Sequence, residues 1–249
     1  MRYGSVTQSA AAMAALALIT VAVMWWGRVR LQRDYLGAAV RSVLQLLGVA
    51  LVVAWIFRNP AGVVVYLGVM LLAATATSMR RIGVGRRDAW RVLVPLICGV
   101  AVTLTPVLVA GALPVEAQSV LPFTAQVIGG AMTATSLTGS RFRDDAHAQW
   151  EVVEGYLALG ATPRQATTEL GRRAAGRSLI PALDQMRSAG LVVLPGAFVG
   201  MLLGGATPAQ AAQVQLLVLF ALMAASVTAA VMLVVLFAPR FGTRRPAPG

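Results

Sequence analysis

Long runs of apolar residues dominate the chain, and short polar connections separate them. A run of about 20 apolar residues, at 1.5 Å per residue in a helix, crosses a hydrocarbon core about 30 Å thick. Seven runs approach or exceed that length, at about 6–27, 36–57, 61–79, 92–112, 120–138, 189–205 and 209–237. We therefore expect an all-α, polytopic integral membrane protein with about seven transmembrane helices in a single domain over residues 1–249.

The connections between these runs alternate between arginine-rich and arginine-poor. The connection after the second run holds only Arg58, and those after the fourth and sixth hold none. Because positive residues collect in cytoplasmic loops, this alternation predicts an N-terminus outside and a C-terminus in the cytoplasm. The arginines of the rich connections and the C-terminal tail are Arg28, Arg30, Arg33, Arg80, Arg81, Arg86, Arg87, Arg91, Arg141, Arg143, Arg164, Arg172, Arg173, Arg177, Arg187, Arg240, Arg244 and Arg245.

Composition supports the membrane class and argues against nucleic-acid binding. Only 12% of the residues are charged, against about a quarter in a soluble domain. The net charge is +12 and every basic residue is an arginine, but the arginines lie in separate clusters between apolar runs, as topology determinants do. The single cysteine, Cys98, has no partner for an intramolecular disulfide and is interpreted as a small apolar filler.

The chain lacks the residues that an enzyme or an ion-coupled carrier needs. There is no zinc-binding His-Glu-x-x-His motif and no phosphate-binding Walker loop, and the only histidine, His147, lies in a polar connection. We therefore expect no catalytic residues, metal site or cofactor. All nine acids fall outside the expected spans, whereas proton- and sodium-coupled carriers commonly use an intramembrane carboxylate. Energy for transport would then come from a separate subunit that hydrolyses ATP.

The polar connection at about 140–188 predicts a small helical structure on the cytoplasmic side. It holds seven arginines and six acids among apolar positions with amphipathic spacing. The heptapeptide Gly-Ala-Thr-Pro-x-Gln-Ala occurs here at 160–166 and again at 205–211. In each copy Thr is a good N-cap, Pro suits the first helical position, and Gln completes a capping box. Helices should therefore start at Thr162 and Thr207.

Residues 154–160 (EGYLALG), followed by Leu179-Ile180-Pro181, resemble the cytoplasmic signature of ABC-transporter permeases. That signature is a Glu, two small residues, three more and a Gly, although Gly155 and Tyr156 here replace the usual alanines. The resemblance implies a coupling helix that sits in a groove of the ATPase subunit, while an ordinary loop turn is the alternative. The residues implied in ATPase coupling are Glu154, Gly160, Thr162, Pro163, Arg164 and Gln165.

Three further motifs extend the resemblance over about 35–237. They are 41–46 (RSVLQL), 129–137 (GGAMTATSL) and 190–196 (GLVVLPG) followed by 204–205 (GG). In this order, with the 154–160 element between them, they resemble the FetB-like family of ABC permeases, which includes bacterial iron exporters and plant aluminium-tolerance half-transporters. The resemblance implies a permease of a bacterial inner membrane, two copies of which pair with two ATPase subunits to export iron or another metal species.

Two departures from the family pattern bear on the solute. Gly130 stands where the family often has Asn, and Ala197-Phe198 stands where it often has Met-Met. Both differences remove potential metal ligands, which leaves the solute open. Met132, Met186 and Met201 are interpreted chiefly as adaptable packing residues.

Polar residues within the spans suggest a pathway. Arg41 and Gln45 are four residues apart and share a helix face, and a charged residue within a span should face the protein interior or water. We hypothesise a cytoplasm-facing polar vestibule, with interhelical packing as the alternative for its hydroxyl residues and snorkelling for Arg41. Its residues are Arg41, Gln45, Thr75, Met132, Thr133 and Ser136.

Two other functions stay open. One is a secondary transporter or channel that works alone, and the other is a non-transporting scaffold or regulatory subunit of a membrane complex. Solute flux through the chain without an ATPase would favour the first, and a complex without flux would favour the second.

Overall fold

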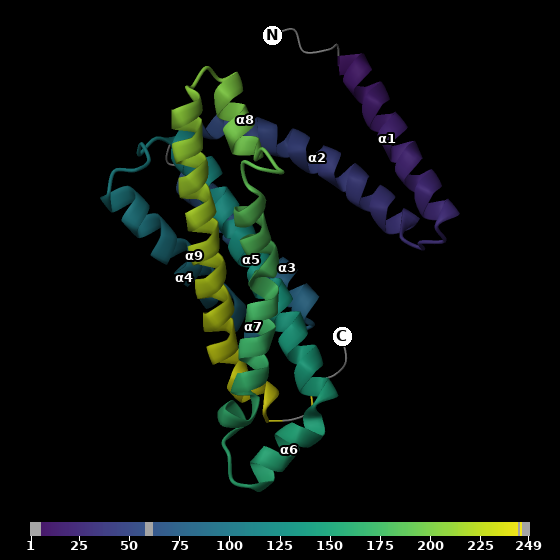
Figure 1. Ribbon diagram of the computed structural model, residues 1–249, viewed down its shortest axis with the longest axis vertical. Coiled ribbons are helices and arrows are strands. Elements are labelled where there is room, and N and C mark those ends of the chain that lie inside the picture. Colours follow the sequence, from purple (N-terminus) through teal and green to yellow (C-terminus); the bar gives the residue numbers. More distant parts are fainter. Residues whose placement is uncertain (1–5, 58–61, 244, 246–249) are drawn as a thin grey trace. The chain divides into compact units, whose positions relative to one another are not determined.

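The computed structural model describes residues 6–57, 62–243 and 245, and helices joined by short connections make up nearly all of this part. The chain divides into two compact units, residues 1–59 with the first two helices and residues 60–249 with the rest (Figure 1). The helices are α1 (Val6–Trp26), α2 (Gln32–Ile56), α3 (Gly62–Ile82), the 3-10 helix η1 (Arg86–Asp88), α4 (Ala89–Val109), α5 (Ala117–Ala148), α6 (Trp150–Ala158), α7 (Pro163–Ser188), α8 (Gly196–Leu203) and α9 (Pro208–Phe241).

Six of the described helices, α1 to α5 and α9, are long and apolar enough to cross a membrane. They overlap six of the seven expected spans, which confirms the all-α, polytopic architecture. Helices α5 and α9 run past the expected ends at 138 and 237, because charged residues end an apolar run without breaking a helix. The expected start of the third span at 61, and the topology arginines Arg58 and Arg244, lie outside the described residues.

The expectation of one continuous span at 189–205 is wrong. Residues 189–195 form a turn in which the Gly190 N–H donates to the Val193 carbonyl at 2.9 Å, and only α8, about 12 Å long, follows it. Gly190 has φ +83°, in the left-handed region that favours glycine, and Pro195 immediately precedes α8. Helices α7 and α8 both pack on α9, and in Figure 1 they follow one another along it. Residues 189–205 therefore do not form one helix: α7 ends at Ser188 and the short helix α8 begins at Gly196.

Helix α9 is central to the second unit, where it packs against α4, α5, α7 and α8. Glycines allow these helices to approach closely, as small residues do between transmembrane helices. A Cβ atom added at Gly99 of α4 would lie 2.8 Å from the Ala225 carbonyl oxygen of α9. One added at Gly171 of α7 would lie 2.5 Å from the Val234 side chain of α9.

The C-terminal end of α9 is tied to its neighbours by aromatic and ionic contacts. Phe142 of α5 meets Phe241 edge to face, with ring centroids 5.1 Å apart, and Phe237 packs beside Phe241. Buried Asp88 at the start of α4 lies 3.7 Å from the guanidinium of Arg240. These contacts hold together the start of α4, the C-terminal part of α5 and the C-terminal end of α9.

Candidate functional site

Helix α6 lies at one end of the second unit, between the end of α5 and the start of α7 (Figure 1). Its inner side is anchored by Val153, which is fully buried. Its outer side carries three large apolar side chains that are exposed, Val152 (55%), Tyr156 (53%) and Leu159 (86%). These three side chains, of which Leu159 lies at the C-terminal cap of α6, form what we call the α6 outer face. Glu154 is also exposed, but on another side of the helix, because residues two apart do not share a helix face.

A tight turn ends α6 and starts α7. Gly160 adopts φ +91°, and the Ala161 N–H donates to the Tyr156 carbonyl at 3.0 Å, as in a glycine-terminated helix. Thr162 then caps α7: its hydroxyl accepts from the Gln165 N–H at 3.3 Å, and its own N–H donates to Gln165 Oε1 at 2.9 Å. The predicted helix start at Thr162 is confirmed.

The second copy of the heptapeptide builds the same turn between α8 and α9. Gly205 also has φ +91°, and the Ala206 N–H donates to the Met201 carbonyl at 3.0 Å. Thr207 and Gln210 form the capping box, with distances of 3.3 and 3.0 Å. The predicted helix start at Thr207 is confirmed, and the repeat is a local device that stops one helix and starts the next.

The start of α7 is fastened to α9 and its middle to α5. The Thr167 hydroxyl donates to the Ala238 carbonyl of α9 at 2.8 Å, and a Cβ added at Gly242 would lie 2.3 Å from the Pro163 carbonyl oxygen. Ser178 of α7 lies 2.5 Å from Thr138 of α5, hydroxyl to hydroxyl. A displacement of the turn would therefore reach both long helices.

All six residues that the resemblance implies in ATPase coupling lie on this α6–α7 elbow. Glu154, Gly160, Thr162, Arg164 and Gln165 are exposed, and Pro163 is half-buried at the start of α7. In the part of the chain that the structure describes, Glu154 has no ion-pair partner. The elbow thus presents both charged and apolar groups outward.

The hydroxyl residues of the hypothesised vestibule divide between two environments. Ser136 of α5 is buried and donates to the Ser78 hydroxyl of α3 at 3.0 Å, and Thr75 is buried on the same helix as Ser78. This placement agrees with the packing interpretation for Thr75 and Ser136. Met132 is half-buried, whereas Thr133 is exposed and donates to the Gly129 carbonyl of its own helix at 3.0 Å.

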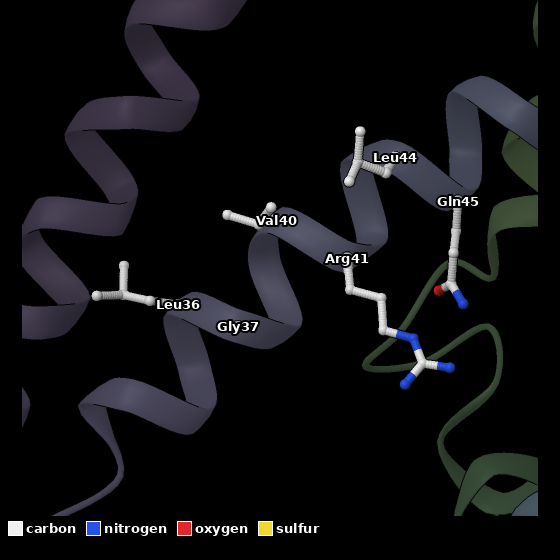
Figure 2. A pocket seen from close by; sticks show the side chains of 6 residues that line it. All are labelled: Leu36, Gly37, Val40, Arg41, Leu44 and Gln45. Atoms are coloured by element: carbon white, nitrogen blue, oxygen red, sulfur yellow. The ribbon is translucent and has the colours of Figure 1, made fainter.

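Arg41 and Gln45 belong to the first unit, on α2. Figure 2 shows both side chains extending from one side of α2, as their spacing of four residues predicts. Together with Leu36, Val40 and Leu44 they line a shallow, mostly apolar depression on this helix. Their role in a pathway stays a prediction.

A cavity of about 650 Å³ lies in the second unit between α5, α7, α8 and α9, a size typical of small-molecule sites. Its polar lining comprises Gln126, Asp184, Gln185, Ser188 and Gln215. Gln215 is only 6% exposed, and its Oε1 atom has no hydrogen-bond partner among the described residues. None of these residues stood out in the sequence; the glutamines within apolar runs were the only available signal.

A model of the family described as "Uncharacterised protein family (UPF0014)" matches residues 7–241, nearly the whole chain. The chain belongs to the UPF0014 family. It is 33% identical to the UPF0014 membrane protein STAR2 of Oryza sativa subsp. japonica over 92% of this chain and 81% of that protein. It is 31% identical to Protein ALUMINUM SENSITIVE 3 of Arabidopsis thaliana over 94% and 86% of the two chains.

One bacterial relative has a name that refers to transport. This chain is 27% identical to the Probable iron export permease protein FetB of Escherichia coli (strain K12), over 84% of this chain and 82% of that protein. The resemblance inferred from the four motifs is thus confirmed, and the chain is a polytopic membrane protein of this family. No solved structure matches it.

The cavity of this UPF0014 chain places one acid beside two of the expected spans. Asp184 lines the same cavity as Gln126 and Gln215, which lie inside the expected fifth and seventh spans. Asp184 lies on α7, which is not among the described helices long and apolar enough to cross a membrane, but α7 continues to Ser188 alongside α5 and α9. Ala197, one of the two departures from the family pattern, also lines this cavity.

Proposed function

We propose that the chain is the membrane subunit of an ATP-driven ABC transporter, and that a separate ATPase subunit docks on the α6 outer face. The observation that carries the proposal is the exposure of Val152, Tyr156 and Leu159 on a short helix held at one end of the unit. Clustered apolar surface on a polar connection marks a contact site.

The anchoring of the elbow explains how such docking would drive transport. Closure of the ATPase on nucleotide would push α6, and the contacts of Thr167 with Ala238 and of Ser178 with Thr138 would pass that movement to α9 and α5. Two copies of the chain and two ATPase subunits would form the complete transporter in the bacterial inner membrane. The name of the Escherichia coli relative supports export of iron or another metal species.

The test is recovery of the ATPase with the chain from native membranes. The tagged wild-type chain should co-purify a subunit that hydrolyses ATP, and Tyr156→Asp with Leu159→Asp should abolish this because both charges enter the apolar contact. Glu169→Gln, at an exposed acid on α7 away from the α6 outer face, is the control and should recover the wild-type amount. Recovery of no ATPase by the wild-type chain would refute the proposal.

Asp184 gives one observation in favour of the secondary-transporter alternative, since it lines a cavity beside the expected fifth and seventh spans and such carriers commonly use a carboxylate within the membrane. Proteoliposomes that contain the chain alone separate the two functions. Our proposal predicts no solute flux under a proton or sodium gradient without the ATPase subunit. Flux that follows the ion gradient, and stops in Asp184→Asn, would favour the alternative.

A further inference from the structure

We propose that the cavity between α5, α7, α8 and α9 is the solute-binding site, and that it takes a small positively charged solute through oxygen atoms of Asp184, Gln126 and Gln215. This inference rests on the proposed transport function but not on how the ATPase docks. The proposed site is formed by residues of the second unit, and none of them belongs to the hypothesised vestibule, which includes Arg41 and Thr75.

The charge of the lining selects the class of solute. Among the described residues that line this cavity and the two that adjoin it, Asp184 is the only charged one. Arg187 lies 3.5 Å from the Asp184 carboxylate, but it does not line the cavity, and both side chains are more than half exposed. An exposed pair of this kind is weak, so the Asp184 carboxylate can turn to a cation in the cavity.

Gln215 points to a ligand independently of charge. A buried polar atom without a partner is costly, and nearly all such atoms in folded proteins are satisfied. The unpaired Oε1 atom of Gln215 is an acceptor, so a metal ion or a hydrogen-bond donor on the solute would satisfy it. The Gln126 carboxamide on α5 supplies a second oxygen to the same cavity.

The break between α7 and α8 places unwound backbone at this cavity. Ser188 and Ala189 at the end of α7, and Pro195 and Gly196 at the start of α8, all line it. Non-helical backbone at membrane depth is tolerated only against protein or a water-filled cavity, and transporter sites are often built at such breaks. The break and the polar side chains therefore converge on one place.

The experiment measures binding to the purified full-length chain in lipid nanodiscs, with no ATPase present. Manganese chloride, followed by electron paramagnetic resonance, and spermidine, followed by calorimetry, separate a metal ion from an organic cation. At least one probe should bind the wild-type chain. Asp184→Asn and Gln215→Leu should each weaken that binding by about tenfold or more, the loss expected when one charged or buried polar contact is removed.

Matched controls come from the same helices. Glu169→Gln changes another acid of α7, which is 61% exposed like Asp184 and also ion-paired with an arginine. Gln213→Leu changes an exposed glutamine two residues from Gln215. Both controls should bind the probe as the wild type does, and an equal loss in either would overturn the assignment.

A stability measurement separates binding from folding. Gln215→Leu removes an unpaired buried acceptor, so its thermal midpoint should equal or exceed that of the wild type. A lower midpoint would show that Gln215 is a packing residue and overturn its role, as would wild-type affinity in both site variants or no binding of either probe. Because the assay holds no ATPase, these results are independent of whether an ATPase docks on α6.

Discussion

Thr162 and Thr207 make the same capping hydrogen bonds in two different elbows, which gives the chain an internal control. Replacing either with Ala should lower the free energy of unfolding by about 1 kcal/mol, the usual cost of a lost N-cap. If the α6–α7 elbow receives the ATPase, only Thr162→Ala should also weaken ATPase binding. Thermal unfolding and co-purification of each variant measure the two effects separately.

An equal loss of ATPase binding in both variants would show that the effect arises from general destabilisation. A loss in Thr207→Ala alone would place the contact at the α8–α9 elbow instead. Because the two turns share the same φ at Gly160 and Gly205, a difference between the variants must come from position and not from local geometry.

Sequence reasoning succeeds at residues whose role is local. The caps at Thr162 and Thr207 follow from residues three positions apart, so the heptapeptide alone contains the information. The placement of Asp184 and Gln215 at one cavity depends on which helices pack together, and nothing within a few residues of either specifies that. The hydrogen bond from Ser136 to Ser78 likewise joins two helices that are far apart in sequence, so no local pattern specifies it.

At the scale of elements, the closest helix contact predicts a sharp effect of one methyl group. A Cβ at Gly99 would lie 2.8 Å from the Ala225 carbonyl oxygen, so Gly99→Ala must separate α4 from α9. Overpacking of this kind costs about 1–3 kcal/mol. The free energy of unfolding of the purified variant in mixed micelles should fall by that amount.

Gly68→Ala supplies the matched control within α3. A Cβ at Gly68 would meet nothing within 4 Å, and alanine is favoured over glycine in a helix by about 1 kcal/mol. Gly68→Ala should therefore leave stability unchanged or raise it. Equal stability of the two variants would show that the α4–α9 contact is looser than the structure indicates.

Apolar runs predicted where helices cross but not whether a crossing is continuous. The apolar residues at 189–205 indicate burial away from water but do not specify a backbone conformation. They therefore gave no sign that α7 ends at Ser188 and that α8 begins only at Gly196. Gly190 and Pro195 were the available signals, since one favours left-handed backbone and the other opens a helix. The extension of α5 to Ala148 was not predicted, because the apolar run ends at about 138 while the charged residues that follow are compatible with a continuing helix.

For the whole molecule, the alternation of arginines predicts a direction of insertion that cysteine labelling can measure. Cys98 is the only cysteine, so Cys98→Ala gives a background without thiols. In that background we place single cysteines at Ala112, Val29 and Ala158, which are exposed in connections or on α6. A membrane-impermeant maleimide added to intact cells should label Ala112→Cys only, because the connection after α4 is expected outside.

Val29→Cys and Ala158→Cys should react only after the membrane is opened, since both lie in connections with clustered arginines, which stay in the cytoplasm. Labelling of Ala158→Cys from outside would remove α6 from reach of any cytoplasmic ATPase, and the proposed coupling would fail with it. The cavity would survive that result, because Asp184, Gln126 and Gln215 are brought together by packing within the second unit and not by its direction in the membrane. Topology therefore constrains the energy source of transport more strongly than it constrains the place where the solute binds.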